Sequence, residues 1–192
     1  MTNTVLLASA SPRRSQILQE LGVCFTAAGV DLDESRLPGE RADAMVVRLA
    51  AAKAEAAAAA AETPVLGADT AVVLGDAIFG KPVDRDDALD MLRRLSGREH
   101  QVMTGVALRW GGRTETELST SHVRFRDIDP DEALAYWQSG EPSDKAGSYA
   151  IQGAGGDFVA SLEGSYSGVV GLPIDVTIAL LAKAGITVQR IP

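Results

Sequence analysis

Short apolar runs alternate along the chain with segments whose apolar residues have helical spacing. Runs such as residues 64–74 are typical of buried strands, and the segments between them predict amphipathic helices. Gly111 and Gly112 separate two further strand-like segments, residues 101–110 and 115–125, and predict a hairpin that pairs these strands antiparallel. The pattern therefore predicts an α/β fold with a mixed sheet.

Local signals predict the position of individual helices. The helix expected at about residues 43–61 is rich in alanine and carries Lys53 in register with its apolar stripe. Asp84 is expected to cap a later helix that ends at Gly97. A final amphipathic helix is expected at residues 172–184, followed by a short terminal strand.

Two other segments are predicted to form a strand and a loop. Residues 23–28 are interpreted as a strand in which the apolar neighbours of Cys24 predict a buried thiol. Residues 140–157 are rich in glycine and are interpreted as a loop.

The composition indicates one domain and limits its partners. With 192 residues, 46% of them hydrophobic, the chain is long enough for a single core, so residues 1–192 are expected to form one domain. Its formal net charge of −8 argues against nonspecific binding to duplex DNA or to anionic membranes. A single cysteine cannot form an internal disulfide, and no apolar run reaches the roughly 18 residues of a membrane span. These features predict a cytoplasmic protein.

Residues 9–14, which read SASPRR, form a candidate phosphate-binding segment. Ser11 is a candidate N-cap and Pro12 the first helical residue, which puts Arg13 and Arg14 at the positive end of the helix dipole. A phosphate would relieve this repulsion, because backbone N–H groups, hydroxyls and guanidinium groups would all face an anion. Taken alone, the segment fits equally well two arginines extended over a surface helix.

Candidate charges for catalysis lie on other segments. Asp69 follows an apolar run and would need a partner such as a metal ion, a lysine or a water to deprotonate. Lys53 and Lys81 are candidate countercharges, and Glu34 could supply an oxygen to a hard cation. Each residue taken alone has a simpler explanation: a structural aspartate, a lysine with a buried stem, or an acid in a solvated loop.

Two glycine-containing segments do not qualify as nucleotide-binding motifs. Residues 75–81 have the spacing G-x-x-x-x-G-K, but Pro82 stands where a P-loop requires Ser or Thr. Residues 153–156 lack the strand-to-helix context of a dinucleotide fingerprint and are interpreted as a flexible turn. Because only His100, His122 and one cysteine are present, Mg²⁺ or Mn²⁺ on carboxylates is expected rather than zinc.

Taken together, the chain resembles the Maf family of nucleoside triphosphate pyrophosphatases from Leu6 to about Leu181. The matching segments occur in the same order and are residues 7–14, Arg48-Leu49-Ala50 with Lys53-Ala54, residues 67–70, residues 80–82, Leu95-Ser96-Gly97 with His100, residues 144–147, Tyr149 with residues 151–153, and residues 170–173. The resemblance implies a mixed sheet with flanking helices in two lobes around a nucleotide cleft, often as a homodimer. It also implies hydrolysis of a nucleoside triphosphate to the monophosphate and pyrophosphate.

The resemblance further implies roles for individual residues. Asp69 corresponds to the proposed catalytic base and, with Glu34, is expected to hold a divalent cation, Mg²⁺ or Mn²⁺. Lys53 and Lys81 correspond to the basic residues of the active groove. The expected substrate-binding residues, from the resemblance and from the charge of a triphosphate, are Ser9, Arg13, Arg14, Thr70, Lys145 and Gln152.

A few residues bear on the nucleotide that is hydrolysed. Arg13, Thr70 and Gln152 match the subgroup that prefers dTTP and UTP, although Ala150 stands where glycine is usual before Ile151. The Gln152 amide offers a donor and an acceptor to the O4 and N3–H edge of uracil or thymine, but guanine presents a similar pair. Two alternatives remain: a nucleotide-binding regulator without turnover, since the family also carries a label as an inhibitor of septum formation, and a pyrophosphatase of modified or purine nucleotides.

Overall fold

The computed structural model describes residues 4–57, 59 and 62–189. They fall into two compact units. The first unit comprises Met1–Asp69, Thr104–Ser119 and Gly171–Pro192, and the second comprises Thr70–Met103 and Thr120–Val170.

The strands form one seven-stranded sheet in the described part of the chain, with the order β2-β1-β3-β5-β6-β7 and β4 beside β3. β1 pairs in parallel with β2 and β3, whereas β3 pairs antiparallel with β4, and β6 antiparallel with β7, so the predicted mixed sheet is confirmed. The strands are β1 Thr4–Leu7, β2 Cys24–Ala27, β3 Val65–Leu74, β4 Ala77–Phe79, β5 Glu99–Trp110, β6 Arg113–Phe125 and β7 Val159–Glu163.

Helices are interspersed with the strands along the chain, and three short 3-10 helices follow α4 within the described residues. The α-helices are α1 Pro12–Glu20, α2 Ala42–Ala56, α3 Arg85–Leu95, α4 Pro130–Gln138, α5 Tyr166–Val170 and α6 Ile174–Lys183. The 3-10 helices are η1 Glu141–Asp144, η2 Ala146–Ser148 and η3 Ala154–Phe158. None of the helices in the described ranges is both long enough and apolar enough to cross a bilayer.

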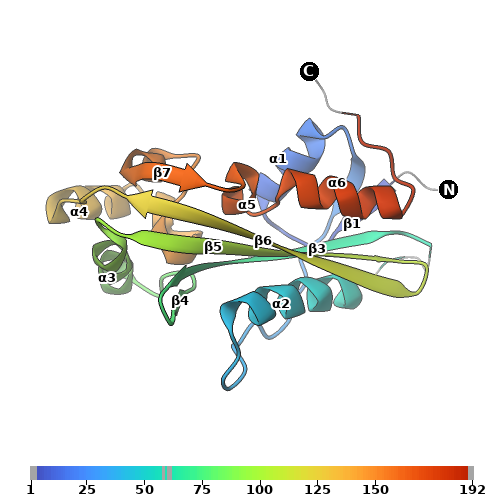
Figure 1. Cartoon of the computed structure of the whole chain (residues 1–192), viewed down its shortest axis with the longest axis horizontal. Coiled ribbons are helices and arrows are strands. Elements are labelled where there is room, and N and C mark those ends of the chain that lie inside the picture. Colours follow the sequence, from blue (N-terminus) through green and yellow to red (C-terminus); the bar gives the residue numbers. More distant parts are fainter. Residues whose placement is uncertain (1–3, 58, 60–61, 190–192) are drawn as a thin grey trace. The chain divides into compact units, whose positions relative to one another are not determined.

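In the first unit, helices cover both faces of the strands. Figure 1 shows α2 on one face and α1 with α6 on the other. The apolar stripes of these helices supply the core side chains Leu18, Leu49 and Leu180, and the strands supply Leu7 and Leu66, all at most 2% exposed. The stripe predicted for α2 includes Lys53, which is indeed buried.

In the second unit, α3 and α4 lie side by side (Figure 1) over a core that includes aromatic residues. The Asp84 carboxylate accepts a hydrogen bond from the Asp87 amide at 2.9 Å, which confirms the predicted cap of α3. Phe125 lies at the centre of the aromatic cluster, with edge-to-face contacts to His100, Tyr149 and Phe158. This core anchors the segments that follow α4.

Several expectations from the sequence are wrong. Cys24 is exposed rather than buried, because β2 is an edge strand of the sheet. The helix expected to reach about residue 61 ends at Ala56, where Ala57 turns to an extended conformation, and residues 58, 60 and 61 lie outside the described part. Residues 186–189 form no strand, and residues 190–192 of the expected terminal strand are also outside the described part.

The segment after the glycine-rich loop contains elements that the sequence analysis did not predict. β7 and α5 form there, between residues 159 and 170. Within the loop, residues 154–158 form η3 instead of a flexible turn. The Glu141 carboxylate, which accepts hydrogen bonds from the Ala154 and Gly155 amides, accounts for the ordering of this loop.

Candidate active site

Three charged side chains predicted for the site meet in the first unit. The Lys53 Nζ atom lies 2.7 Å from Asp69 Oδ1 and 2.7 Å from Glu34 Oε1. Lys53 lies on the buried face of α2, Asp69 in the middle of β3, and Glu34 in the loop before α2. Gly67 allows this meeting, because a Cβ atom there would overlap the backbone of Ala50 on α2.

Burial sets the electrostatics of this group. The side chains of Lys53 and Asp69 are only 10% and 12% exposed, whereas half of the Glu34 side chain, 51%, is exposed. Burial raises the pKa of Asp69, because the charged carboxylate loses water, and the Lys53 ammonium opposes this shift. Asp69 is therefore a stronger base than an aspartate in water while it still has a cation beside it.

The loop that carries Glu34 is attached to α2 by an ion pair that the sequence analysis did not identify. Arg48 Nε donates to Glu40 Oε1 at 2.6 Å and Arg48 Nη2 donates to Glu40 Oε2 at 2.8 Å. The same Nη2 atom donates to the Ser35 carbonyl at 3.1 Å, next to Glu34 in the chain. Arg36 Nε donates to the Glu40 carbonyl at 2.6 Å. Arg48 thus fixes the segment that follows Glu34, which has no helix or strand, at Ser35 and at Glu40.

The start of α1 combines one arginine with defined partners and one without. Arg14 Nε donates to the Gly171 carbonyl at 2.8 Å, and its Nη1 donates to Ser9 Oγ at 3.2 Å. The predicted N-cap residue, Ser11, makes no side-chain cap, although its amide donates to Ser9 Oγ at 3.2 Å. Arg13 is half-buried and makes no side-chain hydrogen bond or ion pair within the described ranges.

Charge interactions link Arg14 to the carboxylates of the same unit. Burial lowers the pKa of Arg14, while Asp69 and Glu34 act in the opposite direction. The guanidinium nevertheless keeps its charge at neutral pH, since arginine does not deprotonate in proteins. The first unit therefore gathers Ser9, Arg14, Lys53, Glu34 and Asp69.

The remaining predicted residues belong to the second unit. Thr70 follows Asp69 directly in β3, Lys81 is exposed after β4, and Gln152 is exposed in the glycine-rich segment. Lys145 forms an ion pair with Asp144, and its Nζ donates to the Glu141 carbonyl at 3.3 Å.

A backbone contact joins two of the segments that carry these residues. The Gly147 amide donates to the Gly80 carbonyl at 3.0 Å, which places the segment after Lys145 beside the one that precedes Lys81. Two lysines predicted for the site thus lie on neighbouring segments of the second unit.

The donors for a divalent cation are few. Over residues 4–57, 59 and 62–189, no group of three or more His, Cys, Asp or Glu side chains is arranged to hold a metal ion. Glu34 and Asp69 nevertheless converge on one point, where both contact Lys53. Two carboxylates suit Mg²⁺, which keeps several waters and takes other ligands from phosphate oxygens. Glu34 and Asp69 are therefore the residues that would hold a metal bound together with its substrate.

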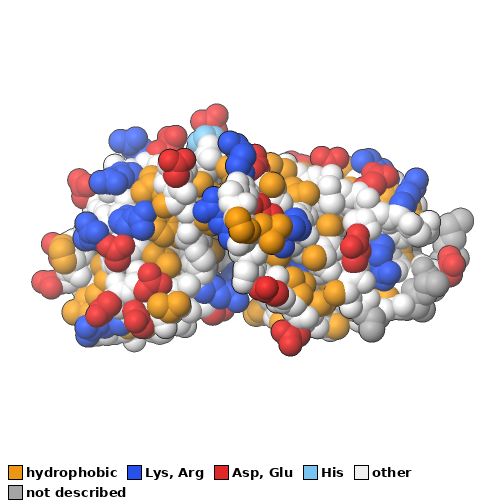
Figure 2. All heavy atoms as spheres, turned by 90° about the horizontal axis from the view of Figure 1, so that it is seen from below, with side chains coloured by type: hydrophobic (Ala, Val, Ile, Leu, Met, Phe, Trp, Pro, Cys, Tyr) orange, Lys and Arg blue, Asp and Glu red, His pale blue; other side chains and the backbone are white. Residues whose placement is uncertain are grey.

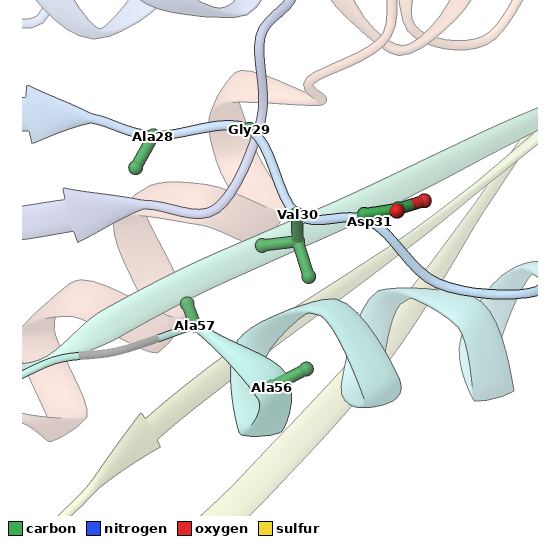
Figure 3. A pocket seen from close by; sticks show the side chains of 6 residues that line it. All are labelled: Ala28, Gly29, Val30, Asp31, Ala56 and Ala57. Atoms are coloured by element: carbon green, nitrogen blue, oxygen red, sulfur yellow. The ribbon is translucent and has the colours of Figure 1, made fainter.

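A pocket of about 300 Å³ lies in the first unit, and Figure 3 shows its lining. Val30 and Ala57 face it from the loop after β2 and from the end of α2, while Asp31 points away from the helix. The lining residues include none of the predicted site residues. We therefore locate the candidate site at Asp69 rather than at this pocket.

Comparison with known proteins identifies the family. A family model described as Maf-like protein matches residues 4–184. A dTTP/UTP pyrophosphatase of Hahella chejuensis is 50% identical over 188 residues, covering 96% of this chain and 94% of that protein. Proteins of the same name from Pseudoalteromonas translucida and Myxococcus xanthus are 50% and 51% identical, covering 94% and 95% of this chain and 97% and 93% of their own lengths. The chain therefore belongs to the Maf family.

Proposed function

We propose that this protein hydrolyses dTTP and UTP to the nucleoside monophosphate and pyrophosphate, a housekeeping function in the nucleotide pool. The observation that carries the proposal is the buried Asp69 carboxylate, 2.7 Å from the Lys53 ammonium, which also contacts Glu34. About 50% identity over nearly full length to proteins named dTTP/UTP pyrophosphatase supports the substrate.

Phosphate binding falls to the start of α1 in this proposal. A triphosphate carries about four negative charges at neutral pH, so an acidic protein needs local cations to hold it. Arg13 and the α1 backbone amides that Ser11 leaves uncapped supply donors for phosphate oxygens. Arg14 is already held by Ser9 and Gly171, so its charge is in place before the substrate arrives. Lys81 and Lys145 of the second unit are the further cations proposed for substrate binding.

Asp69 is the proposed base. Its raised pKa lets it accept the proton of a water molecule, whose oxygen then bonds to a phosphorus of the α–β anhydride. The bond from that phosphorus to the bridging oxygen breaks, and the two products are the monophosphate and pyrophosphate. Lys53 orients the Asp69 carboxylate through their hydrogen bond and offsets the charge that develops during attack.

We propose that Glu34 and Asp69 hold a divalent cation, Mg²⁺ or Mn²⁺, together with the triphosphate. When bound, such a cation neutralises phosphate charge and polarises the bond that breaks. The loop fixed by Arg48 keeps Glu34 at this position in the free protein. Lys53 contacts both carboxylates and limits their mutual repulsion in the free protein.

Base recognition is assigned to the second unit. Gln152 offers a donor and an acceptor to uracil or thymine, and Thr70 completes the pattern of the subgroup.

We also propose a cytoplasmic homodimer without nucleic-acid or membrane partners. The net charge of −8 supports the absence of such partners, and on the face in Figure 2 charges of both signs are interspersed. Size-exclusion chromatography with light scattering tests the dimer.

A panel of nucleoside triphosphates with Mg²⁺ or Mn²⁺, scored for released pyrophosphate, tests the activity. Preferred turnover of dTTP and UTP is expected. Preference for purine or modified nucleotides would contradict the substrate assignment while leaving a pyrophosphatase. Nucleotide binding without any turnover would instead support a regulator and would contradict the catalytic proposal.

A further inference from the structure

The glycine-rich segment of the second unit encloses the carboxylate of Glu141. Glu141 Oε2 accepts a hydrogen bond from the Ala154 amide at 3.1 Å, and Oε1 accepts one from the Gly155 amide at 3.1 Å. Oε1 also accepts the Tyr136 hydroxyl at 2.7 Å. Consecutive backbone amides that converge on an anion form a typical anion-binding site, and here the anion is part of the chain.

The glycines are explained by this enclosed carboxylate. A Cβ atom on Gly153 would overlap the Glu141 carboxylate, and one on Gly155 would overlap the Tyr136 hydroxyl. Glycine at both positions therefore lets the backbone close around the acid. This contact accounts for an ordered η3 where the sequence indicates a flexible turn.

Glu141 and Tyr136 also hold the turn that carries Gln152. The Gly153 amide donates to the Ala150 carbonyl at 3.2 Å, which closes a turn with Gln152 at its corner. The Ala150 amide donates to the Tyr136 hydroxyl at 3.0 Å, and Glu141 holds the residues directly after Gly153. The start of the turn is thus attached to α4 through Tyr136, and its end is attached through Glu141 to η1, which begins at that residue.

The Glu141 carboxylate is charged and the Tyr136 hydroxyl is protonated at neutral pH. Burial raises the pKa of Glu141, but the hydrogen bonds from Tyr136 and from the Gly155 and Ala154 amides outweigh it, so the pKa is lowered overall. Burial and Glu141 raise the pKa of Tyr136. The hydrogen bonds to the carboxylate are therefore charge-assisted, which makes them stronger than neutral ones.

We propose that Glu141 and Tyr136 are positioning residues that set the preference for the pyrimidine base by fixing the turn that carries Gln152. This inference rests on the proposed function, in which Gln152 reads the base. An amide distinguishes bases only if its donor and acceptor are held in a fixed orientation, and the Gln152 side chain is exposed. The orientation of its backbone must therefore come from the turn.

Lys145 provides a way to separate base recognition from phosphate binding. Its Nζ donates to the backbone carbonyl of Glu141, not to the carboxylate. The substitution Glu141→Gln preserves this carbonyl, yet it replaces one carboxylate oxygen by an NH₂ group that cannot accept from the amides or from Tyr136. The change should therefore disturb the Gln152 turn and keep the hydrogen bond that holds Lys145, although the charge attraction between Lys145 and the carboxylate is lost.

The experiment compares the parent protein with Glu141→Gln, Tyr136→Phe and the double variant. Glu163→Gln, at an exposed residue of β7, is the control for the loss of one carboxylate. The kcat and KM values for dTTP, UTP and GTP are measured for each protein, together with hydrogen exchange of the Ala154 and Gly155 amides without nucleotide. Tyr136→Phe removes one hydroxyl and keeps the ring, so it remains informative if Glu141→Gln does not fold.

We expect Glu141→Gln to raise KM for dTTP and UTP about 10-fold with little change in kcat, to lower the preference over GTP, and to speed up exchange of both amides. Tyr136→Phe should act in the same direction but less, and the double variant should show less than the sum of the two effects, because both residues belong to one network. An equal loss for all three nucleotides, with lowered stability, would show a merely structural role and overturn the proposal. An unchanged preference for dTTP and UTP over GTP, despite faster exchange of the two amides, would also overturn the proposal. A parent protein without pyrimidine preference would instead overturn the proposed substrate and this inference together.

Discussion

Arg48 holds Glu40 through two hydrogen bonds of 2.6 and 2.8 Å, one to each carboxylate oxygen, and this pair connects α2 to the loop that carries Glu34. A guanidinium presents its donors in a rigid fork that matches a carboxylate, so the pair specifies a geometry as well as an attraction. Glu34 itself is half exposed and lies in a segment without regular structure. Its contact with Lys53 therefore depends on how well Arg48 fixes the loop.

Replacement of Arg48 by Lys should keep the charge but lose the fork and the bond to the Ser35 carbonyl. We expect kcat/KM for dTTP to fall about 10-fold and the Mg²⁺ concentration for half-maximal rate to rise, because Glu34 is held less well. Titration of the rate with Mg²⁺ measures both effects. The control is Arg93→Lys, which alters an exposed pair with Asp90 on α3. An unchanged Mg²⁺ requirement in Arg48→Lys would show that the loop is positioned by other contacts.

Replacement of Arg13 and of Arg14 by Ala should have different effects on the free protein. Arg14 makes hydrogen bonds to Gly171 and Ser9, so its loss should lower the free energy of unfolding by about 1 kcal/mol. Loss of Arg13 relieves charge at the start of α1 and should leave stability unchanged or raised by at most about 0.5 kcal/mol. Denaturant unfolding without nucleotide measures both values.

The same two variants test phosphate binding at α1. Each lost arginine should lower kcat/KM for dTTP and UTP by about 10- to 100-fold, as for loss of a charged hydrogen bond to the transition state. An Arg13→Ala variant that is less stable but keeps kcat/KM would show that Arg13 is structural. The assignment of residues 9–14 as a phosphate-binding segment would then have to be withdrawn.

Much of the fold could be predicted from local patterns, because residue spacing indicates where helices begin, where turns lie and which face of a helix is buried. The Asp84 cap, the turn at Gly111 and Gly112, and the position of Lys53 on the apolar face of α2 all follow from spacing. The exposure of Cys24 could not be predicted this way, since it depends on β2 being at the edge of the sheet.

The residues of the candidate site could be predicted only in part from the sequence. Lys53 interrupts an apolar stripe, which identified it as a partner for a buried carboxylate, and Asp69 is that carboxylate. Glu40, Arg48 and Glu141 were missed as functional candidates, because charged residues in polar loops or on helix surfaces usually face solvent. Glu141 could have been found only through the glycines at residues 153–156, which indicate a close backbone approach without naming what approaches.

A chelator should abolish pyrophosphate release, since the proposed cation is held by only two carboxylates and the substrate. Glu34→Gln should raise the Mg²⁺ or Mn²⁺ concentration for half-maximal rate about 10-fold or more, because one charged ligand is lost. Glu55→Gln, which removes an exposed carboxylate from α2, is the matched control. Undiminished activity in excess chelator would contradict the requirement for metal.

The buried His100 predicts how stability depends on pH. Burial lowers the pKa of His100 from 6.5 to about 4, so the folded protein stays neutral at this residue while the unfolded chain takes up a proton. The free energy of unfolding therefore decreases as the pH falls from 6.5 to about 4, by up to about 3 kcal/mol. Unfolding free energies of the parent and His100→Gln, compared over this range, measure the effect. His122→Gln, at a side chain 41% exposed, is the control for losing a histidine. A constant difference between the parent and His100→Gln would contradict the prediction.

Replacement of Asp69 by Asn should keep the binding of the product dTMP and lower turnover by about 100-fold or more, because an amide cannot accept the proton of water. Burial raises the pKa of Asp69, so the parent's kcat/KM should fall on the acidic side at a pH above the ordinary aspartate value of 3.8. The protonated carboxyl is the inactive form, which gives the sign of this dependence. Pyrophosphate release across the acidic range, with binding of dTMP measured by calorimetry, checks both statements. Asp76→Asn, in the exposed turn between β3 and β4, is the matched control. If Asp69→Asn kept turnover within a few-fold of the parent, Asp69 would be a structural partner of Lys53, and the base would have to be sought elsewhere.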